Sequence, residues 1–470
     1  MSQTKCLSLV AGAGVSLTAA LSASAVTPVQ NSDEVRAIVS EMLADAENRS
    51  SLLAAGGGGH DGGMFYLADS NGNFRLNVGG QIQFRYLLNF RDDTEVDGNS
   101  GPNAIANRGN DDFESGFQTA NTRLWFTGNI VDPNLYYNIT GNFFRDGGDF
   151  NLEEAYAGYK WDNGFSFQWG QFVLPFLREK LINQWYQLAA DRSLTDITFD
   201  QGYSQGVQLG YAAEEFRAML AFSDGFRSED SEFGSVNDTN GNFGFSGQGG
   251  EADWAITARV EIKFAGAWDQ FKDFTSMPES QFAAMLGVAG HIEGSANDIL
   301  VEGGDPTDPT DDFEAETRFG GWTVDLSLEG DGWNLYIAGN GAYTDNSSGT
   351  GAPDGFNDSR TDYGLVAQGG FFFPDTDWEL FARYDGIFAD EDRNVDVGGG
   401  NNDDDDTFST VTVGTNYYWS GHAAKFTFDV QYFIDNASSG LQTGTNREIG
   451  YLGSGEDGEV TLRFQFQLLF

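Results

Sequence analysis

The sequence predicts an all-β protein, a transmembrane antiparallel β-barrel of about 16 strands with a long inward-folding loop and a short N-terminal helix. Segments in which apolar and polar residues alternate recur from residue 74 onward, as in strands with two different faces. The 62 glycines and the aromatic content of 14% fit a barrel with one face in lipid and one face in water. No apolar run reaches the roughly 18 residues that a transmembrane helix needs. We therefore expect the chain to cross a membrane with strands.

Residues 1–25 have the features of a secretory signal peptide. Lys5 precedes the apolar stretch LSLVAGAGVSLTAALS, and Ala23, Ser24 and Ala25 offer a small-residue cleavage site. Cys6 is the one cysteine of the chain and lies inside this signal. The mature protein is expected to contain no thiol and to be stable without disulfides.

Residues 26–63 predict a periplasmic amphipathic helix followed by a glycine-rich tether. Asn31 and Glu34 resemble a capping pair, apolar residues follow at helical spacing, and GGGGHDGG ends the segment. A solvated N-terminal arm and a trimerising coiled coil are both open at this point; the short length favours the arm.

Residues 64–470 predict the barrel. In the stretch FRLNVGGQIQFRYLLNF, Phe74, Leu76 and Val78 fall on one face, while Arg75 and Asn77 fall on the other. The last stretch, VTLRFQFQLLF, has the same alternation and the length of a membrane-spanning strand. The other candidate strands begin near Asn121, Leu135, Leu152, Phe165, Gln205, Phe216, Trp254, Phe282, Arg318, Trp333, Tyr363, Trp378, Thr410 and Lys425.

The connections between these strands are of two kinds. Tight turns are expected at 131–134, 162–164, 330–332, 374–377 and 420–423, and they alternate with longer loops. Short turns belong on the periplasmic side of such barrels and long loops on the outside. The connection from about Gly266 to Gln281 is longer than a periplasmic turn.

The long loops carry most of the negative charge, in runs such as DPTDPTDDFEAE and NNDDDD. A net charge of −46 argues against nucleic acid as a partner. The favoured interpretation of the runs is solvated surface. Binding of Ca²⁺ stays open because hard cations prefer carboxylate oxygens, although no run has a complete EF-hand pattern.

The inward face of the strands is predicted to be mixed and slightly basic. Two interpretations are open: these cations pair with neighbouring carboxylates, as Arg259 would with Glu261, or they set the potential for passing ions. The candidate pore-lining residues are Arg75, Arg85, Arg123, Arg217, Arg259, Lys263, Arg383, Lys425 and Arg463.

The segment from Gly170 to Gly206 is too apolar for a free external loop. Folding into the barrel would cover its apolar side chains and narrow the pore; packing on the outer rim or on a neighbouring subunit is the alternative. The residues that an inward fold would place at the constriction are Arg178, Glu179, Lys180, Asp191 and Arg192.

These segments resemble the phosphate-selective porin O and P family. The resemblance spans most of residues 74–470 and is most specific at Gly170, Gln171, Phe172, Pro175, Phe176 and Glu179. It implies a trimeric sixteen-stranded outer-membrane barrel that passes anions. It also implies that Phe470 is an assembly signal, a terminal aromatic residue that the outer-membrane barrel assembly machinery recognises. The chain departs from the family pattern in having 25 basic against 71 acidic residues and no lysine-rich ladder.

The expected function is an outer-membrane porin, in a bacterium with a two-membrane envelope, that passes small hydrophilic solutes and ions, including anions such as phosphate. The alternatives are a cation-preferring or non-selective porin, a structural or adhesive surface barrel, and an enzyme. The enzyme is disfavoured because the three histidines, His60, His291 and His422, are spread over a tether, a strand and a turn. No cofactor and no catalytic residue are expected; lipid, small ions and solutes are the expected partners.

Overall fold

The computed structural model describes residues 56–61, 63–91, 112–143, 148–229, 252–295, 299–301, 313–348, 359–390, 407–435, 449–452 and 457–470. The chain divides into two units, Met1–Ala55 and Gly56–Phe470. The predicted signal peptide and N-terminal helix lie outside the described residues, as do most of the acidic runs.

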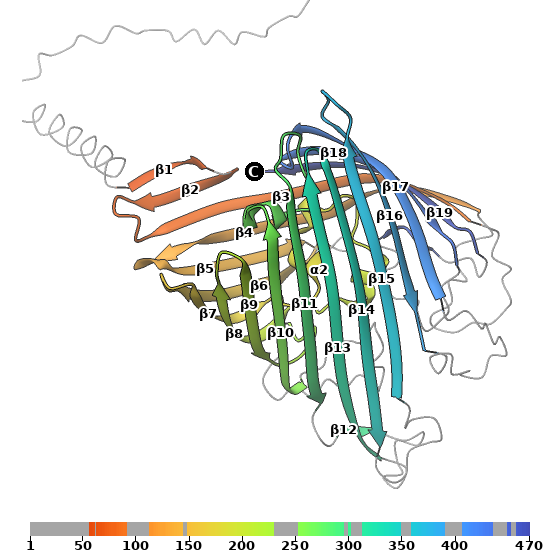
Figure 1. Ribbon diagram of the computed structural model, residues 1–470, viewed down its shortest axis with the longest axis horizontal. Helices are drawn as coiled ribbons and strands as arrows, with labels where there is room; N and C mark the ends of the chain where they lie inside the picture. Colours follow the sequence, from red (N-terminus) through yellow and green to blue (C-terminus); the bar gives the residue numbers. More distant parts are fainter. Residues whose placement is uncertain are drawn as a thin grey trace, which may run out of the picture. The chain divides into compact units, whose positions relative to one another are not determined.

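Sixteen long strands, β3 to β11 and β13 to β19, form one closed antiparallel ring (Figure 1). Each strand pairs with the next, and β19 pairs with β3 to close the ring. Each predicted strand start falls in or beside one of them, so the predicted barrel is confirmed. Their bounds are β3 (Arg75–Phe90), β4 (Phe113–Ile130), β5 (Asp132–Phe143), β6 (Phe150–Lys160), β7 (Phe165–Phe172), β8 (Ser204–Ala212), β9 (Phe216–Ser223), β10 (Ala252–Ala265), β11 (Ala283–Ser295), β13 (Phe313–Gly330), β14 (Trp333–Ser348), β15 (Ser359–Phe372), β16 (Trp378–Phe388), β17 (Thr407–Ser420), β18 (Ala424–Phe433) and β19 (Val460–Leu469).

The alternation predicted for the last strand is observed on β19. Thr461 and Arg463 are fully buried inside the ring, whereas Phe466 and Leu468 point outward and are 52% and 56% exposed. Such an apolar outer face is what lipid contact requires. The ring closes next to Phe470, whose backbone exchanges two hydrogen bonds with Gly80 on β3, at 2.8 and 3.1 Å.

The predicted tight turns join neighbouring strands at one end of the barrel. Gly164, between β6 and β7, has φ +90°, and Gly332, between β13 and β14, has φ +71°. Glycine adopts these left-handed conformations without steric cost. This end of the barrel is called the turn side, and the opposite end the loop side.

The glycine-rich stretch expected as a tether is a strand. β1 (Gly56–Asp61) pairs with β2 (Met64–Asp69), and β2 pairs with β3 from Arg75 to Val78. The pairing of β19 with β3 begins at Gln81, so β2 occupies the edge of β3 that β19 leaves free. Backbone hydrogen bonding along this edge orders the glycines. A further short strand, β12 (Ile299–Val301), pairs with β13.

The long connection between β10 and β11 folds over the turn side. It contains the 3-10 helix η2 (Trp268–Lys272) and buries Phe271 and Phe274. The Phe271 carbonyl accepts a hydrogen bond from Arg178 at 2.8 Å. This packing accounts for a length that a simple turn would not need.

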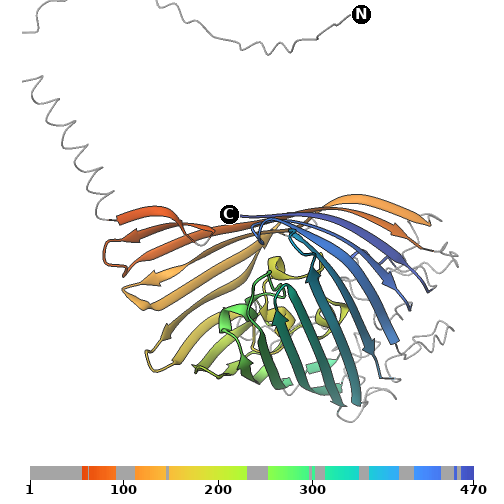
Figure 2. The ribbon, with the colours of Figure 1, turned by 45° about the horizontal axis from the view of Figure 1, so that its top comes forward.

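Residues 173–203, here called the inner segment, connect β7 and β8 and contact the inward faces of strands across the ring (Figure 2). The segment contains α2 (Arg178–Leu181), η1 (Gln184–Tyr186) and α3 (Leu194–Phe199). Its Phe176, Leu177 and Leu194 are buried in a cluster that includes Phe408 of β17 and Phe433 of β18. None of the helices in the described part of the chain combines the length and apolar character that crossing a membrane would take.

Candidate functional site: a constriction between two cavities

Several basic residues of the strands hold the inner segment. Arg85 of β3 and Arg463 of β19 both bind the carboxylate of Asp191, Arg463 at 3.3 Å, and Arg383 of β16 donates to the Asp191 backbone carbonyl at 2.8 Å. All four side chains are buried. Asp429 of β18 completes this group, because it accepts from Arg463 at 2.6 Å and from the backbone N–H of Ala190 at 2.9 Å.

The same kind of contact recurs around the ring. Arg259 of β10 pairs with Glu261 at 2.9 Å and with Asp325 at 2.8 Å, and it also donates to the Phe176 carbonyl. Lys425 of β18 donates to the Gln187 carbonyl at 2.8 Å. The expected pairing of Arg259 with Glu261 is therefore present, and these cations lie beneath the inner segment.

The predicted pore-lining residues thus fall into three groups. Arg85, Arg259, Arg383, Lys425 and Arg463 are buried, because the apolar inner segment covers that part of the lumen wall. Near the turn side, Arg75 pairs with Asp61 at 3.3 Å, while Arg217 and Lys263 lie over the ring of Trp268 at 3.9 and 5.4 Å. Arg123 differs from both groups in that it lines open space.

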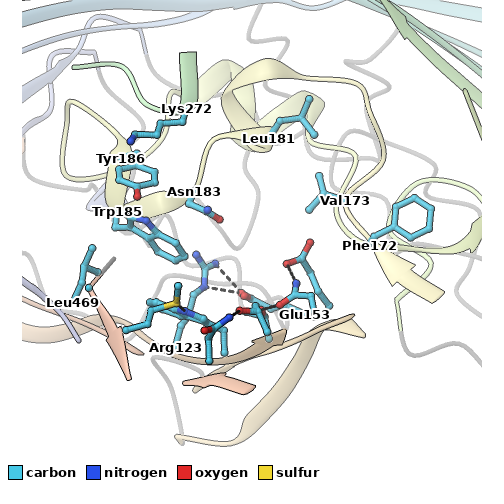
Figure 3. A pocket seen from close by; sticks show the side chains of 18 of the residues that line it. Arg123, Glu153, Phe172, Val173, Leu181, Asn183, Trp185, Tyr186, Lys272 and Leu469 are labelled. Atoms are coloured by element: carbon cyan, nitrogen blue, oxygen red, sulfur yellow. Dashed lines mark hydrogen bonds and ion pairs between the residues drawn. The ribbon is translucent and has the colours of Figure 1, made fainter. Parts of the chain in front are cut away.

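Two cavities lie beside the inner segment, along β4 to β6. The turn-side cavity has a volume of about 1050 Å³ and reaches Pro133 and Ala423 at the tight turns. The loop-side cavity has a volume of about 340 Å³ and reaches Asn142 and Ile449. The residues that line both cavities, here called the junction, are Arg123, Glu153, Lys180, Arg192 and Tyr203. Figure 3 shows Arg123 and Glu153 on the wall, opposite Asn183 and Trp185 of the inner segment.

The wall side of the junction is an ion pair built on a β-bulge. Nε and Nη2 of Arg123 donate to Oε1 of Glu153 at 3.1 and 2.7 Å. On β6, Glu154 pairs with Thr140 of β5, and Leu152 pairs with the next β5 residue, Gly141. Glu153 therefore has no pairing partner on β5 and is the extra residue of the bulge. A bulge re-aims side chains, so Glu153 as well as Glu154 lines the turn-side cavity.

The segment side of the junction carries two cations. Lys180 pairs with Asp200 at 2.5 Å, and Nε of Arg192 lies 3.6 Å from Asp196. Burial acts to raise the pKa of Asp200, but the positive charges of Lys180 and Arg227 have the larger effect. The pKa of Asp200 is therefore lowered, and its ionised form is favoured. Burial raises the pKa of Asp196 well above its ordinary value, more than Arg192 lowers it. The raised pKa of Asp196 favours its neutral form, so Asp196 offsets the positive charge of Arg192 less than an ordinary carboxylate would.

Local hydrogen bonds fix these side chains. Ser193 caps α3, accepting from the Asp196 N–H at 3.0 Å. Its own N–H and hydroxyl donate to Glu179 at 2.7 and 2.6 Å. Glu179 is buried and lines neither cavity, and burial raises its pKa more than Arg383 lowers it. Arg192 also donates to the Ile182 carbonyl at 2.9 Å, which orients its guanidinium.

Of the five residues predicted for the constriction, Lys180 and Arg192 line both cavities and Asp191 lines the loop-side cavity. Arg178 instead donates to Ser327 at 2.8 Å and is buried away from both. Sequence analysis missed Glu153, because a bulge cannot be read from alternation, and it missed Asp200 and Tyr203. The Ser193 to Asp196 spacing was an available signal for the start of α3.

His291, which sequence analysis assigned to a strand, lies 2.9 Å from Glu293 through Nε2, and its Nδ1 lies 2.7 Å from the Thr257 hydroxyl. The ring of Phe226 packs on the His291 imidazole, with the two ring centroids 3.8 Å apart. The Thr257 side chain is fully buried. His291 is buried as well. The described residues also contain no group of three or more His, Cys, Asp or Glu placed to hold a metal ion.

The family model for phosphate-selective porin O and P matches residues 106–468. The chain belongs to this family. It is an outer-membrane porin, and the closed ring of sixteen strands is its transmembrane channel. The search of curated proteins gave no match.

The porin fold is also similar to solved outer-membrane channels. An anion-selective porin from Comamonas acidovorans matches with 12% identity, 84% of this chain and 99% of that chain covered, and a TM-score of 0.49. The channel DcaP of Acinetobacter baumannii matches with 14% identity, coverage of 84% and 97%, and a TM-score of 0.47. The trimer form of OmpT from Vibrio cholerae matches with 13% identity, coverage of 84% and 99%, and a TM-score of 0.46.

Proposed function

We propose that this porin is an anion-preferring diffusion channel whose solutes pass through the junction. The observation that carries the proposal is that the residues common to the two cavities include three cations and one carboxylate. Rings of charged side chains filter permeating ions when they line the narrow part of a pore. Because Arg123, Lys180 and Arg192 line both cavities, we place the narrow part of the path at these residues.

The charges of the junction favour anions without binding them tightly. Glu153 offsets Arg123, and Asp200 offsets Lys180, so Arg192, whose neighbour Asp196 has a raised pKa, supplies most of the excess positive charge. A channel needs attraction that is strong enough for entry and weak enough for release. Chloride and phosphate are small enough to use such a site, and the preference for anions over cations is expected to be modest.

The rival proposal is a cation-preferring porin, which the net charge of −46 would favour. Exposed carboxylates act poorly at a distance, because the Debye length is about 8 Å at physiological salt. Charges that line the passage act at contact range. The local charge of the junction is therefore expected to decide selectivity at physiological salt.

Catalysis plays no part in the proposal. We further propose that the porin forms homotrimers, that its mature chain follows a signal peptide of residues 1–25, and that Phe470 takes part in barrel assembly. These proposals rest on the sequence and on the family to which the chain belongs.

The reversal potential of the purified porin in a potassium chloride gradient tests the preference. We expect the permeability ratio of chloride to potassium to exceed one, and we expect sodium phosphate to carry a measurable anion current. A ratio below one at 0.15 M salt would show that the acidic loops decide selectivity and would overturn the proposal.

A further inference from the structure

The two cavities differ in chemistry, and the difference points to a class of solute. Apart from Tyr203, the Phe, Tyr and Trp rings that line the cavities belong to the turn-side cavity alone. Among them are Trp125 of β4, Tyr136 of β5, Tyr156 of β6, and Trp185 of the inner segment. The loop-side cavity is lined mainly by charged and amide side chains. A path for inorganic ions alone has no use for such a concentration of rings at one end.

Four of these rings form two pairs on the cavity lining. Trp125 and Trp185 stack with centroids 4.7 Å apart and an interplanar angle of 22°, so the wall and the inner segment are joined by this contact. Tyr136 and Tyr156 meet edge to face at 6.3 Å. Aromatic faces carry partial negative charge and attract the C–H groups of a flat solute.

Amide and hydroxyl groups lie among the rings. Asn138 donates to Glu154 at 2.7 Å and accepts from Thr140 at 3.1 Å, which fixes it on the wall. Asn183 is exposed and makes no capping hydrogen bond with η1, which it precedes. In Figure 3 it lies on the segment side, opposite Arg123 and Glu153. Side chains of this kind recognise hydroxyl groups.

We propose that the turn-side cavity binds a sugar that carries an anionic group, with the anion at the junction and the sugar body against the rings and amides of the cavity. The volume of about 1050 Å³ is that of a small-molecule site and far exceeds the needs of inorganic phosphate. Arg123 and Lys180 supply the charge at the narrow end, and Trp185 and Asn183 supply the surface for the body. A flat aromatic anion would use the rings but would offer no hydroxyl groups to Asn183, whereas a sugar offers several. This inference rests on the proposed anion preference of the junction.

The test compares three phosphates by the concentration at which each halves the chloride current through single channels. Glucose 6-phosphate carries both charge and hydroxyl groups, phenyl phosphate carries charge and a ring, and inorganic phosphate carries charge alone. We expect the half-blocking concentration of glucose 6-phosphate to be at least about tenfold lower than those of phenyl phosphate and inorganic phosphate. The reason is that each hydroxyl group that forms a hydrogen bond with the cavity adds to binding. Equal potency of the three would overturn the inference while leaving anion preference standing.

Two pairs of variants locate the site. Asn183→Ala should raise the half-blocking concentration of glucose 6-phosphate severalfold, whereas Asn163→Ala, in the exposed turn between β6 and β7, should not. Trp185→Leu should have a similar effect, and Trp169→Leu, on the outer face of β7 and 41% exposed, should not. The half-blocking concentration of inorganic phosphate should change little in all four. If each variant matches its control, the sugar binds elsewhere and the assignment fails. A wild-type channel that prefers potassium over chloride would instead defeat the proposed function itself.

Discussion

Arg463 on β19 lies 3.3 Å from the carboxylate of Asp191 in the inner segment, and both side chains are buried. Arg85 binds the same carboxylate, and Arg383 binds the backbone carbonyl of the same residue. Three strands of the ring thus converge on one residue of the inner segment. Their arginines fix the segment in place, and the two cavities lie along β4 to β6, where Arg123, Lys180 and Arg192 line both of them.

Replacing Asp191 with Asn should weaken the hold on the inner segment. Breaking a buried ion pair costs about 3–5 kcal/mol, because the remaining charge stays buried without its partner. The measurement is the temperature at which the folded band converts to the unfolded band on an SDS gel, and we expect it to fall clearly. Asp162→Asn, in an exposed turn, should leave this temperature unchanged. Equal temperatures for the two variants would contradict the clamping role of Asp191.

Glu153→Gln should increase the preference for anions. The change removes the one carboxylate of the junction and leaves the positive charge of Arg123 without its offset. The ratio of chloride to potassium permeability, obtained from reversal potentials, should rise about twofold or more, given the Coulomb energy of one charge at contact range. Glu214→Gln, in the exposed turn between β8 and β9, is the matched control and should leave the ratio unchanged. An unchanged ratio in Glu153→Gln, as in the control, would place Glu153 outside the path.

The anion preference should fall as the pH rises from 6 to 8. Asp273 lines the turn-side cavity, and burial raises its pKa to about 7, more than the Thr275 N–H and Lys272 lower it. The Asp273 carboxyl is neutral below that pH and negative above it, so this group adds negative charge to the cavity on going from pH 6 to pH 8. His422 lies 3.7 Å away, but burial lowers its pKa well below the ordinary value, so it stays neutral over this range. The other charged groups that act on Asp273 are Glu379, Lys425 and Glu329.

The Asp273→Asn variant should show a weaker pH dependence than the wild type. Asp269 is exposed on the same connection between β10 and β11, and the Asp269→Asn variant should keep the wild-type pH dependence. Reversal potentials recorded at several pH values provide the comparison. An unchanged pH dependence in Asp273→Asn would assign the titration to another group.

Alternation along the strands was enough to predict the ring, because each strand of a barrel has one lipid face and one inner face. It predicted that Arg85, Arg259 and Arg463 point inward, and the structure buries all three side chains. It could not show that the inner segment covers them, since that depends on contacts between residues far apart in the chain, such as Arg463 with Asp191.

The junction was predictable only in part. The apolar character of the segment indicated that it needs cover, and its two cations Lys180 and Arg192 were identified from the sequence. Glu153 was not, because the bulge in β6 shifts the alternation by one residue. Alternation alone likewise gave Arg85 and Arg123 the same role. Both side chains are buried, but Arg123 lines the two cavities and Arg85 lines neither.

The most direct test of the account is the reversal potential of Arg123→Gln beside that of Arg75→Gln, at 0.15 M salt. Both changes remove one guanidinium from the inner face of neighbouring strands, but Arg75 lines neither cavity. One charge at about 8 Å changes the energy of a passing ion by about 0.5 kcal/mol in water, and by less when salt screens it. The change has opposite signs for chloride and potassium, so the two changes add in the permeability ratio. The ratio of chloride to potassium permeability should therefore fall about twofold to fivefold in Arg123→Gln. It should stay near the wild-type value in Arg75→Gln. Equal effects of the two substitutions, or no effect of Arg123→Gln, would contradict the claim that ions pass through the junction.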